Sequence, residues 1–407
     1  MLRRMMLVGL AALVVFGMAA VAQEPVTIEF WHAMSSGHQP NLQKLVDDFI
    51  AECPYITVTL VYQGGYGTLQ GKIDAAVVAG NLPAIAQVYE NWVTPIAPIL
   101  YPIGNFMTDA EKADILDGLV ASNTYNGVLT TVPFNKSIMV LYYNKSLVTT
   151  PPTTWAEFFE MSKALTVDLD GDGKIDRYGT AFRPAANPEQ FLIFLEQAGG
   201  SILNADWTEV ALNNDAGKTA TEFVASLIPY SYITSEYMSD HIKDAAMFVD
   251  TSAGIGYNQK AATNAGFELG VAMLPAGPAN FNSMIQGTNL AVFNTDNLTQ
   301  AQKDAAVLLA RFLLRAENTV FWAEKSGYQP VTKSAYGTEE WLTYVSTHDF
   351  QVPMSEQMLN AFAQILHPNY GDMRNVLSTG FEEIMRGVVP PLEGLENMAA
   401  EIEALLE

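Results

Sequence analysis

The residues whose types and spacing point most directly to chemistry lie in one short acidic segment, DLDGDGKID. Carboxylates alternate with other residues along it, and a central glycine permits a sharp turn. A hard cation prefers six to eight oxygen ligands, and this is the ligand spacing of a calcium-binding loop. The candidate ligand positions are Asp168, Asp170, Asp172, Lys174 and Asp176.

The twelfth position of this segment is Gly179, where a calcium loop carries a bidentate glutamate. Glu189 or Glu196 would have to supply that ligand from the helix that follows. The segment therefore predicts a structural calcium ion. The alternative is a solvated acidic turn capped by its own backbone, and no other cofactor is expected.

Sequence signatures of enzymes are weak in this chain. Neither HExxH nor GxSxG occurs, and the five histidines lack the spacing of metal ligands. No residue pattern orients a nucleophile, so we predict that the protein is not an enzyme. A secreted calcium-dependent hydrolase remains as the enzymatic alternative.

Composition and charge limit the class of protein. The chain has 407 residues, 49 % of them apolar and 16 % charged, which is typical of a globular protein. This length favours two lobes of roughly 150–200 residues each. A formal net charge of −23 makes nucleic acid an unfavourable partner, because phosphate backbones require a basic surface.

The first 22 residues have the pattern of a signal peptide. Arg3 and Arg4 precede an apolar stretch over residues 6–21, and Ala20-Val21-Ala22 fits the small-residue cleavage rule. A membrane anchor is the alternative. Because no other segment reaches ~18 uninterrupted apolar residues, we predict an exported, periplasmic protein without further membrane spans.

The first elements of the mature chain predict a parallel α/β sheet. Strands are expected at 26–32, 56–62 and 84–89, with a helix between the first two. In such a sheet, ligand-binding groups gather beyond the carboxyl ends of the strands. Tyr66 and Glu90 both follow predicted strand ends.

The stretch PFNKSIMVLYYN divides into two halves of different character. Residues 135–137 are polar and predict an exposed turn, whereas 138–143 are apolar and predict a strand buried on both faces.

The rest of the chain is expected to be mostly helical, with two further strands. The strands are expected at 267–273 and 290–293, and the helices at 155–165, 187–198, 215–228, 239–248, 299–315, 316–325 and over most of 338–406.

A set of aromatic and polar residues near strand ends suits a polyol ligand, since a carboxylate accepts from hydroxyls while rings cover the C–H face. The set is Tyr66, Glu90, Ser137, Trp155 and Tyr328. Arg374, in a Gly-Asp-Met-Arg turn, is one of few arginines that could reach a cleft.

Several of these segments together resemble a known family. The motifs EFWHAM, VLYYNKS and PPTTWAEF, with the more specific YQGGY, PAIAQVYE, PFNKS, IQGTN and GYQPVTK, cover most of the mature chain. They resemble the extracellular solute-binding proteins of ABC importers, family 1. Within that family, the resemblance is to the members that bind glycerol 3-phosphate.

The resemblance implies a set of ligand-binding residues. Glu90 would hold glycerol hydroxyls, and Tyr328 and Arg374 would donate to the phosphate. A buried Arg374 would then disfavour a neutral sugar, which would leave it unpaired. Lys136 departs from the small residue expected at its position. The implied positions are Tyr66, Glu90, Ser137, Trp155, Thr251 or Ser252, Gly287, Tyr328 and Arg374.

The resemblance also implies the architecture, a two-lobe periplasmic-binding-protein fold of type II with the ligand cleft between the lobes. The expected lobes are discontinuous, 23–135 with 286–330 and 136–285 with 331–407, and the chain would cross near 133–137, 283–288 and 328–333. The expected ligand is glycerol 3-phosphate or a glycerophosphodiester, with an oligosaccharide as the alternative. The expected partners are the membrane subunits of an ABC importer, and the protein is expected to be a monomer.

Overall fold

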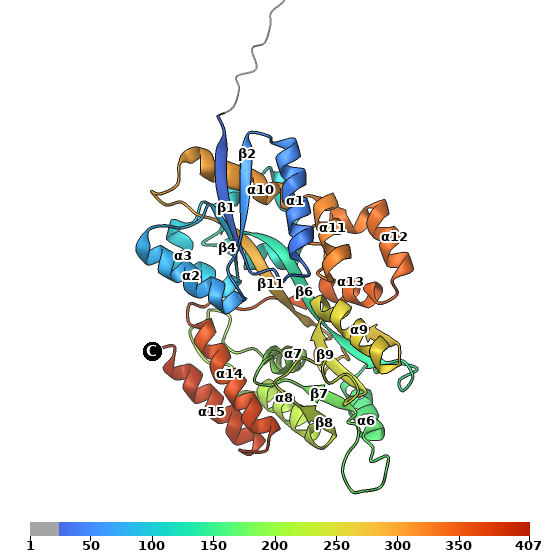
Figure 1. Ribbon diagram of the computed structural model, residues 1–407. Helices are drawn as coiled ribbons and strands as arrows, with labels where there is room; N and C mark the ends of the chain where they lie inside the picture. The colour runs from blue at the N-terminus through green and yellow to red at the C-terminus, as the bar shows by residue number, and fades with distance from the viewer. Residues whose placement is uncertain (1–23) are drawn as a thin grey trace, which may run out of the picture.

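The structure, a computed structural model, describes residues 24–407 (Figure 1). The predicted signal peptide, residues 1–22, lies outside the described residues. Among residues 24–407, no helix is both long enough and apolar enough to cross a lipid bilayer.

Strands and helices alternate along most of the chain. The strands are β1 (Val26–His32), β2 (Ile56–Tyr62), β3 (Ile85–Val88), β4 (Thr124–Tyr125), β5 (Val128–Leu129), β6 (Val132–Asn144), β7 (Thr180–Phe182), β8 (Ser231–Ile233), β9 (Met247–Thr251), β10 (Leu269–Ala272), β11 (Ser283–Val292) and β12 (Ala361–Phe362). The α-helices are α1 (Gln39–Glu52), α2 (Tyr66–Ala79), α3 (Glu90–Ile96), α4 (Asp109–Asp114), α5 (Asp117–Ser122), α6 (Trp155–Leu165), α7 (Glu189–Gln197), α8 (Asp215–Ser226), α9 (Ile255–Ala265), α10 (Gln300–Leu313), α11 (Ala316–Ser326), α12 (Glu339–Thr347), α13 (Gln351–Leu359), α14 (Tyr370–Met385) and α15 (Pro391–Ala404).

An eight-stranded sheet runs through the molecule in the order β10-β6-β11-β3-β1-β2, with β9 added on β6 and β12 on β11. Strands β2, β1 and β3 are parallel to one another, as predicted, and β11 is antiparallel to β3. In Figure 1, β1 and β2 lie with α1, α2 and α10 in one lobe, and β7–β9 lie with α6–α8, α14 and α15 in the other. Strands β6 and β11 run between the two lobes.

Strand β6 serves both lobes. Its first half, residues 132–138, pairs with β11, and its second half, residues 139–143, pairs with β9. The buried apolar strand predicted at 138–143 is confirmed, but the exposed turn predicted at 135–137 is wrong. Those polar residues are buried within the strand, because other polar groups around them satisfy their side chains.

The helix predicted at 239–248 is also wrong. This stretch is a loop followed by β9, which begins at Met247 and pairs with β6. Ile242 in this loop is nevertheless buried, in the same apolar cluster as Ile255 and Ala262 of α9. Pairing with a strand more than 100 residues away is a tertiary effect that the spacing of apolar residues does not reveal.

The contacts of residues 334–347 bear on the third crossing between the lobes, which is predicted at 328–333. The 3₁₀ helix at Ser334–Gly337 and α12 pack against α11, and Ala335 and Trp341 share an apolar cluster with Val320 and Ala323. The contacts therefore group residues 334–347 with the first lobe. They favour a crossing nearer β12, and the exact lobe boundaries stay a prediction.

Gly287 permits the close approach of β11 to β6, so we expect its replacement to destabilise the fold. Its φ is +97°, and an added Cβ would lie 1.9 Å from the backbone oxygen of Asn135. Gly287→Ala should lower the free energy of unfolding by about 2–5 kcal/mol, measured by urea denaturation. Gly71→Ala, in an open position of α2, should instead stabilise the protein by about 0.5–1 kcal/mol. Equal effects of the two substitutions would contradict this account.

Candidate ligand-binding cleft

Two adjoining cavities form a cleft between the lobes. Their volumes are about 520 and 450 Å³, and they share five lining residues: Tyr66, Arg183, Tyr237, Asp250 and Thr251. Tyr66 begins α2 in the first lobe, whereas Asp250 and Thr251 end β9 in the second. The cleft therefore has walls from both lobes, as a site for a captured ligand requires.

The larger of these two cavities is polar and contains two arginines with carboxylate neighbours. Arg374, in α14, donates from Nε and Nη2 to the two carboxylate oxygens of Glu189, at 2.6 and 3.0 Å. Burial opposes the charge of Arg374, but the Glu189 carboxylate outweighs it and raises the pKa of Arg374. Arg183 Nη1 lies 3.9 Å from Asp250 Oδ2, beyond hydrogen-bond distance. The charges of this cavity therefore balance in pairs.

Tyrosines form much of the remaining wall. The hydroxyl of Tyr66 accepts from Asn135 Nδ2 at 2.9 Å and lies 3.4 Å from the hydroxyl of Tyr328. The rings of Tyr66 and Tyr89 meet edge to face, with centroids 5.1 Å apart. Burial raises the pKa of Tyr66 well above its ordinary value, so its phenol stays neutral and can donate to a ligand.

Only some of the predicted ligand residues line the cleft. Tyr66 and Thr251 line both cavities, Tyr328 lines one and Arg374 the other. Ser137, Ser252 and Gly287 line neither cavity. Ser137 Oγ accepts from Thr251 Oγ1 at 2.8 Å and Ser252 Oγ accepts from the Ile138 backbone N–H at 3.2 Å.

Glu90 is held by a partner that the sequence did not suggest. Its carboxylate accepts from Lys136 Nζ, which also donates to the backbone oxygen of Gly287 at 3.0 Å. Lys136 has 0 % and Glu90 3 % of its surface exposed. Burial lowers the pKa of Lys136, and the Glu90 carboxylate opposes that shift. Glu90 therefore does not line the cavity, contrary to its predicted contact with glycerol hydroxyls.

The structure does not bring Trp155 to the cleft. Its ring stacks on Phe223 with centroids 4.2 Å apart, and its Nε1 donates to Gln197 Oε1 at 2.7 Å. These contacts put Trp155 in the core of the second lobe, where β-sheet and helices bury it. A tryptophan at the start of an amphipathic helix fits such a core position as well as a ligand wall.

Other lining residues were absent from the prediction, chiefly Tyr89, Arg183, Asp250, Gln286 and Tyr237. Arg183 follows β7 directly, so the rule that ligand groups follow strand ends would have found it. Strand β7 has only three residues, too few to recognise by alternation. Glu189 was considered only as a calcium ligand.

The acidic segment forms an exposed loop, and none of its residues lines the two cavities of the cleft. Carboxylate oxygens of Asp168, Asp170 and Asp176 lie within 4.8 Å of one another. Neither predicted twelfth ligand joins them, since Glu189 binds Arg374 and Glu196 accepts from Asn282 Nδ2 at 3.1 Å. A calcium ion in this loop stays a prediction of the sequence.

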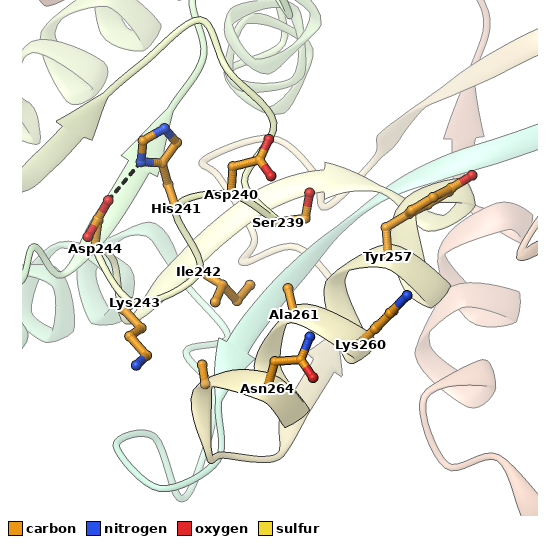
Figure 2. A pocket seen from close by; sticks show the side chains of 11 residues that line it. Ser239, Asp240, His241, Ile242, Lys243, Asp244, Tyr257, Lys260, Ala261 and Asn264 are labelled. Carbon is orange, nitrogen blue, oxygen red and sulfur yellow. Dashed lines mark hydrogen bonds and ion pairs between the residues drawn. The ribbon is translucent and has the colours of Figure 1, made fainter.

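A further cavity of about 520 Å³ lies beside the cleft, between the loop over residues 239–244 and α9 (Figure 2). His241 joins two carboxylates here, with Nδ1 2.8 Å from Asp244 and Nε2 2.7 Å from Glu236. The hydroxyl of Tyr232 lies 3.0 Å from the same Nδ1. The connection between β8 and β9 that holds this cluster also carries Tyr237, which lines the cleft.

The fold therefore has two lobes with a polar, tyrosine-lined cleft between them. The sequence matches the bacterial extracellular solute-binding proteins over residues 44–346, and the chain belongs to that family. Members of this family bind small-molecule ligands and work with the membrane subunits of ABC importers. That this chain catalyses no reaction agrees with its family but stays a prediction.

Individual relatives differ in the ligand that their names give. The chain is 26 % identical over 411 residues to the sn-glycerol-3-phosphate-binding periplasmic protein UgpB of Escherichia coli K12, covering 92 % of this chain and 91 % of that one. Its fold is similar to the cyclic α-maltosyl-1,6-maltose binding protein of Arthrobacter globiformis (TM-score 0.82, 23 % identity, 94 % and 99 % covered). It is also similar to UgpB of Mycobacterium tuberculosis in complex with glycerophosphocholine (TM-score 0.79, 20 % identity, 94 % and 98 % covered). The predicted two-lobe periplasmic-binding fold is thereby confirmed.

The buried Lys136–Glu90 pair yields a prediction about stability. Lys136→Met should lower the free energy of unfolding by about 3–5 kcal/mol, because it leaves the Glu90 carboxylate buried without a partner. The double variant Lys136→Met, Glu90→Gln should recover most of that loss, since it removes both charges. Urea denaturation of the three proteins measures the effect. A single variant as stable as the wild type would show that the pair is dispensable.

The His241 cluster predicts a dependence of stability on pH. The Glu236 and Asp244 carboxylates raise the pKa of His241 above its ordinary 6.5, against a smaller effect of burial. The stabilisation is therefore complete below pH 6.5 and is lost as the pH rises through the folded-state pKa. The difference in melting temperature between the wild type and His241→Gln should shrink as pH rises from 5.5 to 9. A difference that stays constant with pH would contradict the prediction.

Proposed function

We propose that this protein captures a glycerophosphodiester in its interlobe cleft and delivers it to an ABC importer. The observation that carries the proposal is the pair of arginines, Arg183 and Arg374, on the wall of one polar cavity together with tyrosine hydroxyls. Arginine donors hold phosphate oxygens well because the hydrogen bonds are charge-assisted. The tyrosine rings offer faces for the apolar parts of the ligand.

The charge of the cavity favours a phosphodiester over a phosphomonoester. Glu189 and Asp250 lie beside the two arginines, so their carboxylates already balance the guanidinium charges. A monoester such as glycerol 3-phosphate approaches two negative charges at neutral pH, whereas a diester carries one. The second charge would meet these carboxylates in a partly desolvated site, where repulsion is strong. A positively charged headgroup on the phosphodiester would offset even its single negative charge.

Two residues that the sequence assigned to the ligand, Glu90 and Arg374, have partners within the chain. Glu90 is engaged by Lys136 and does not line the cavity, so glycerol hydroxyls need other acceptors, among which Gln286 and Asn187 line it. Arg374 is already paired with Glu189, so a neutral sugar would leave no unpaired charge there. The proposal now depends on the two-arginine cavity.

An oligosaccharide is the second candidate ligand, and the same pairing of charges favours it. A cleft whose charges balance can hydrogen-bond neutral hydroxyls without leaving a desolvated charge. The fold is similar to sugar-binding as well as phosphodiester-binding proteins. Membership of a solute-binding family disfavours a calcium-dependent hydrolase.

The setting proposed for this activity follows from the family and the amino terminus. The protein would be exported to the periplasm, act as a monomer and close its lobes around the ligand by a hinge motion. The membrane subunits of an ABC importer would recognise the closed form.

Parallel calorimetric titrations of the refolded mature protein test the ligand. We expect glycerophosphocholine to bind at least about tenfold more tightly than glycerol 3-phosphate at pH 7.5, because of the second phosphate charge. Lowering the pH to 5.5 should narrow the gap, since the phosphomonoester then becomes largely monoanionic. Maltose serves as the neutral comparison. Binding of maltose without either phosphate ligand would overturn the proposal in favour of an oligosaccharide.

A further inference from the structure

The two arginines of the cleft differ in how far their donors are already occupied. Arg374 donates from Nε and Nη2 to the Glu189 carboxylate. Its Nη2 also donates to the Ala186 backbone oxygen at 3.4 Å. This two-pronged pairing is the strongest geometry available to a guanidinium. A ligand would have to compete with Glu189 for Arg374. Arg374, the arginine that the sequence predicted as a ligand, therefore has more of its donors occupied within the chain than Arg183 has.

Arg183 is buried but poorly paired. Only 8 % of its surface is exposed, yet among the described residues its Nε has no hydrogen-bond partner. Its nearest carboxylate, on Asp250, is 3.9 Å away. Buried charged groups are normally hydrogen-bonded, so an open donor at this position calls for an acceptor from outside the chain.

The surroundings hold Arg183 ready for such an acceptor. Its backbone N–H donates to Gln190 Oε1 at 2.8 Å, and its backbone oxygen accepts from Asn187 N at 2.7 Å. The guanidinium carbon lies 4.8 Å from the centre of the Tyr237 ring, which supports one face of the side chain. Because Arg183 lines both cavities, a ligand spanning the cleft must pass it.

We propose that Arg183, rather than Arg374, selects the anionic group of the ligand, binding its phosphate oxygens through Nε and one Nη. This inference rests on the proposed function and assigns its specificity to one residue. Asp250 partly balances the charge of Arg183 without occupying its donors, because the two groups stay beyond hydrogen-bond distance. Glu189 and Arg374 form a structural pair that shapes the cavity wall.

Two matched double variants separate these roles, since each removes one positive and one negative charge. In Arg183→Gln, Asp250→Asn, we expect glycerophosphocholine to bind about 10- to 100-fold more weakly, the range for hydrogen bonds to a charged group. In Arg374→Gln, Glu189→Gln, the loss should be at least tenfold smaller. Arg386→Gln, which removes an exposed arginine paired with Glu382 far from the cleft residues, should bind as the wild type does.

Calorimetry with glycerophosphocholine and melting curves of each variant give the readout. If the Arg183 double variant is unstable, Arg183→Lys replaces it, because lysine keeps the charge but loses the planar fork and should still weaken binding severalfold. Equal losses in the two double variants, or a larger loss at Arg374, would overturn the inference while leaving the proposed function in place. A wild type that binds maltose and no phosphate ligand would overturn both.

Discussion

The ion pair between Lys136 and Glu90 is the constraint on which the centre of the molecule depends. Lys136 lies in β6 opposite Gly287 of β11, and its backbone oxygen accepts from Gln329 N at 2.7 Å. Its ammonium binds the carboxylate at the start of α3 and the oxygen of Gly287. Two fully buried charges persist only when they satisfy each other, so four segments must meet at one point. That point lies where strands pass from one lobe to the other.

The dependence of buried polar residues on distant partners explains why part of the fold could be predicted from the sequence and part could not. Strands β1 and β2 match the predicted ranges 26–32 and 56–62, and α7, α8, α10 and α11 agree closely, because local apolar periodicity determines them. Residues 135–137 looked like a turn because they are polar. They are strand residues because distant groups satisfy them, as Gln87 does for Asn135. Polarity predicts exposure only when no partner is available, and the chain order does not reveal the partner.

In the candidate site, too, the positions of some residues could be predicted but their partners could not. Tyr66 and Arg374 could be placed in the cleft from motifs and strand ends, and both line it. Their states could not be predicted, because Arg374 and Glu189 are 185 positions apart and Arg183 and Asp250 are also remote in sequence. Pairing decides whether a charged side chain is a ligand or part of the scaffold. A motif records the type of residue and its position, but not its partner.

For the proposed ligand, local pairing of charges also outweighs the overall charge. A net charge of −23 opposes the approach of any anion, but charges beyond about 8 Å are largely screened at physiological ionic strength. Inside the cleft the groups that matter are two arginines and two carboxylates. Since Glu189 occupies Arg374, Arg183 is the incompletely paired cation of the cleft among residues 24–407, and it lies next to a carboxylate that it does not bind. If a ligand takes up the charge of Arg183, as proposed, a second negative charge would face the Asp250 carboxylate without compensation.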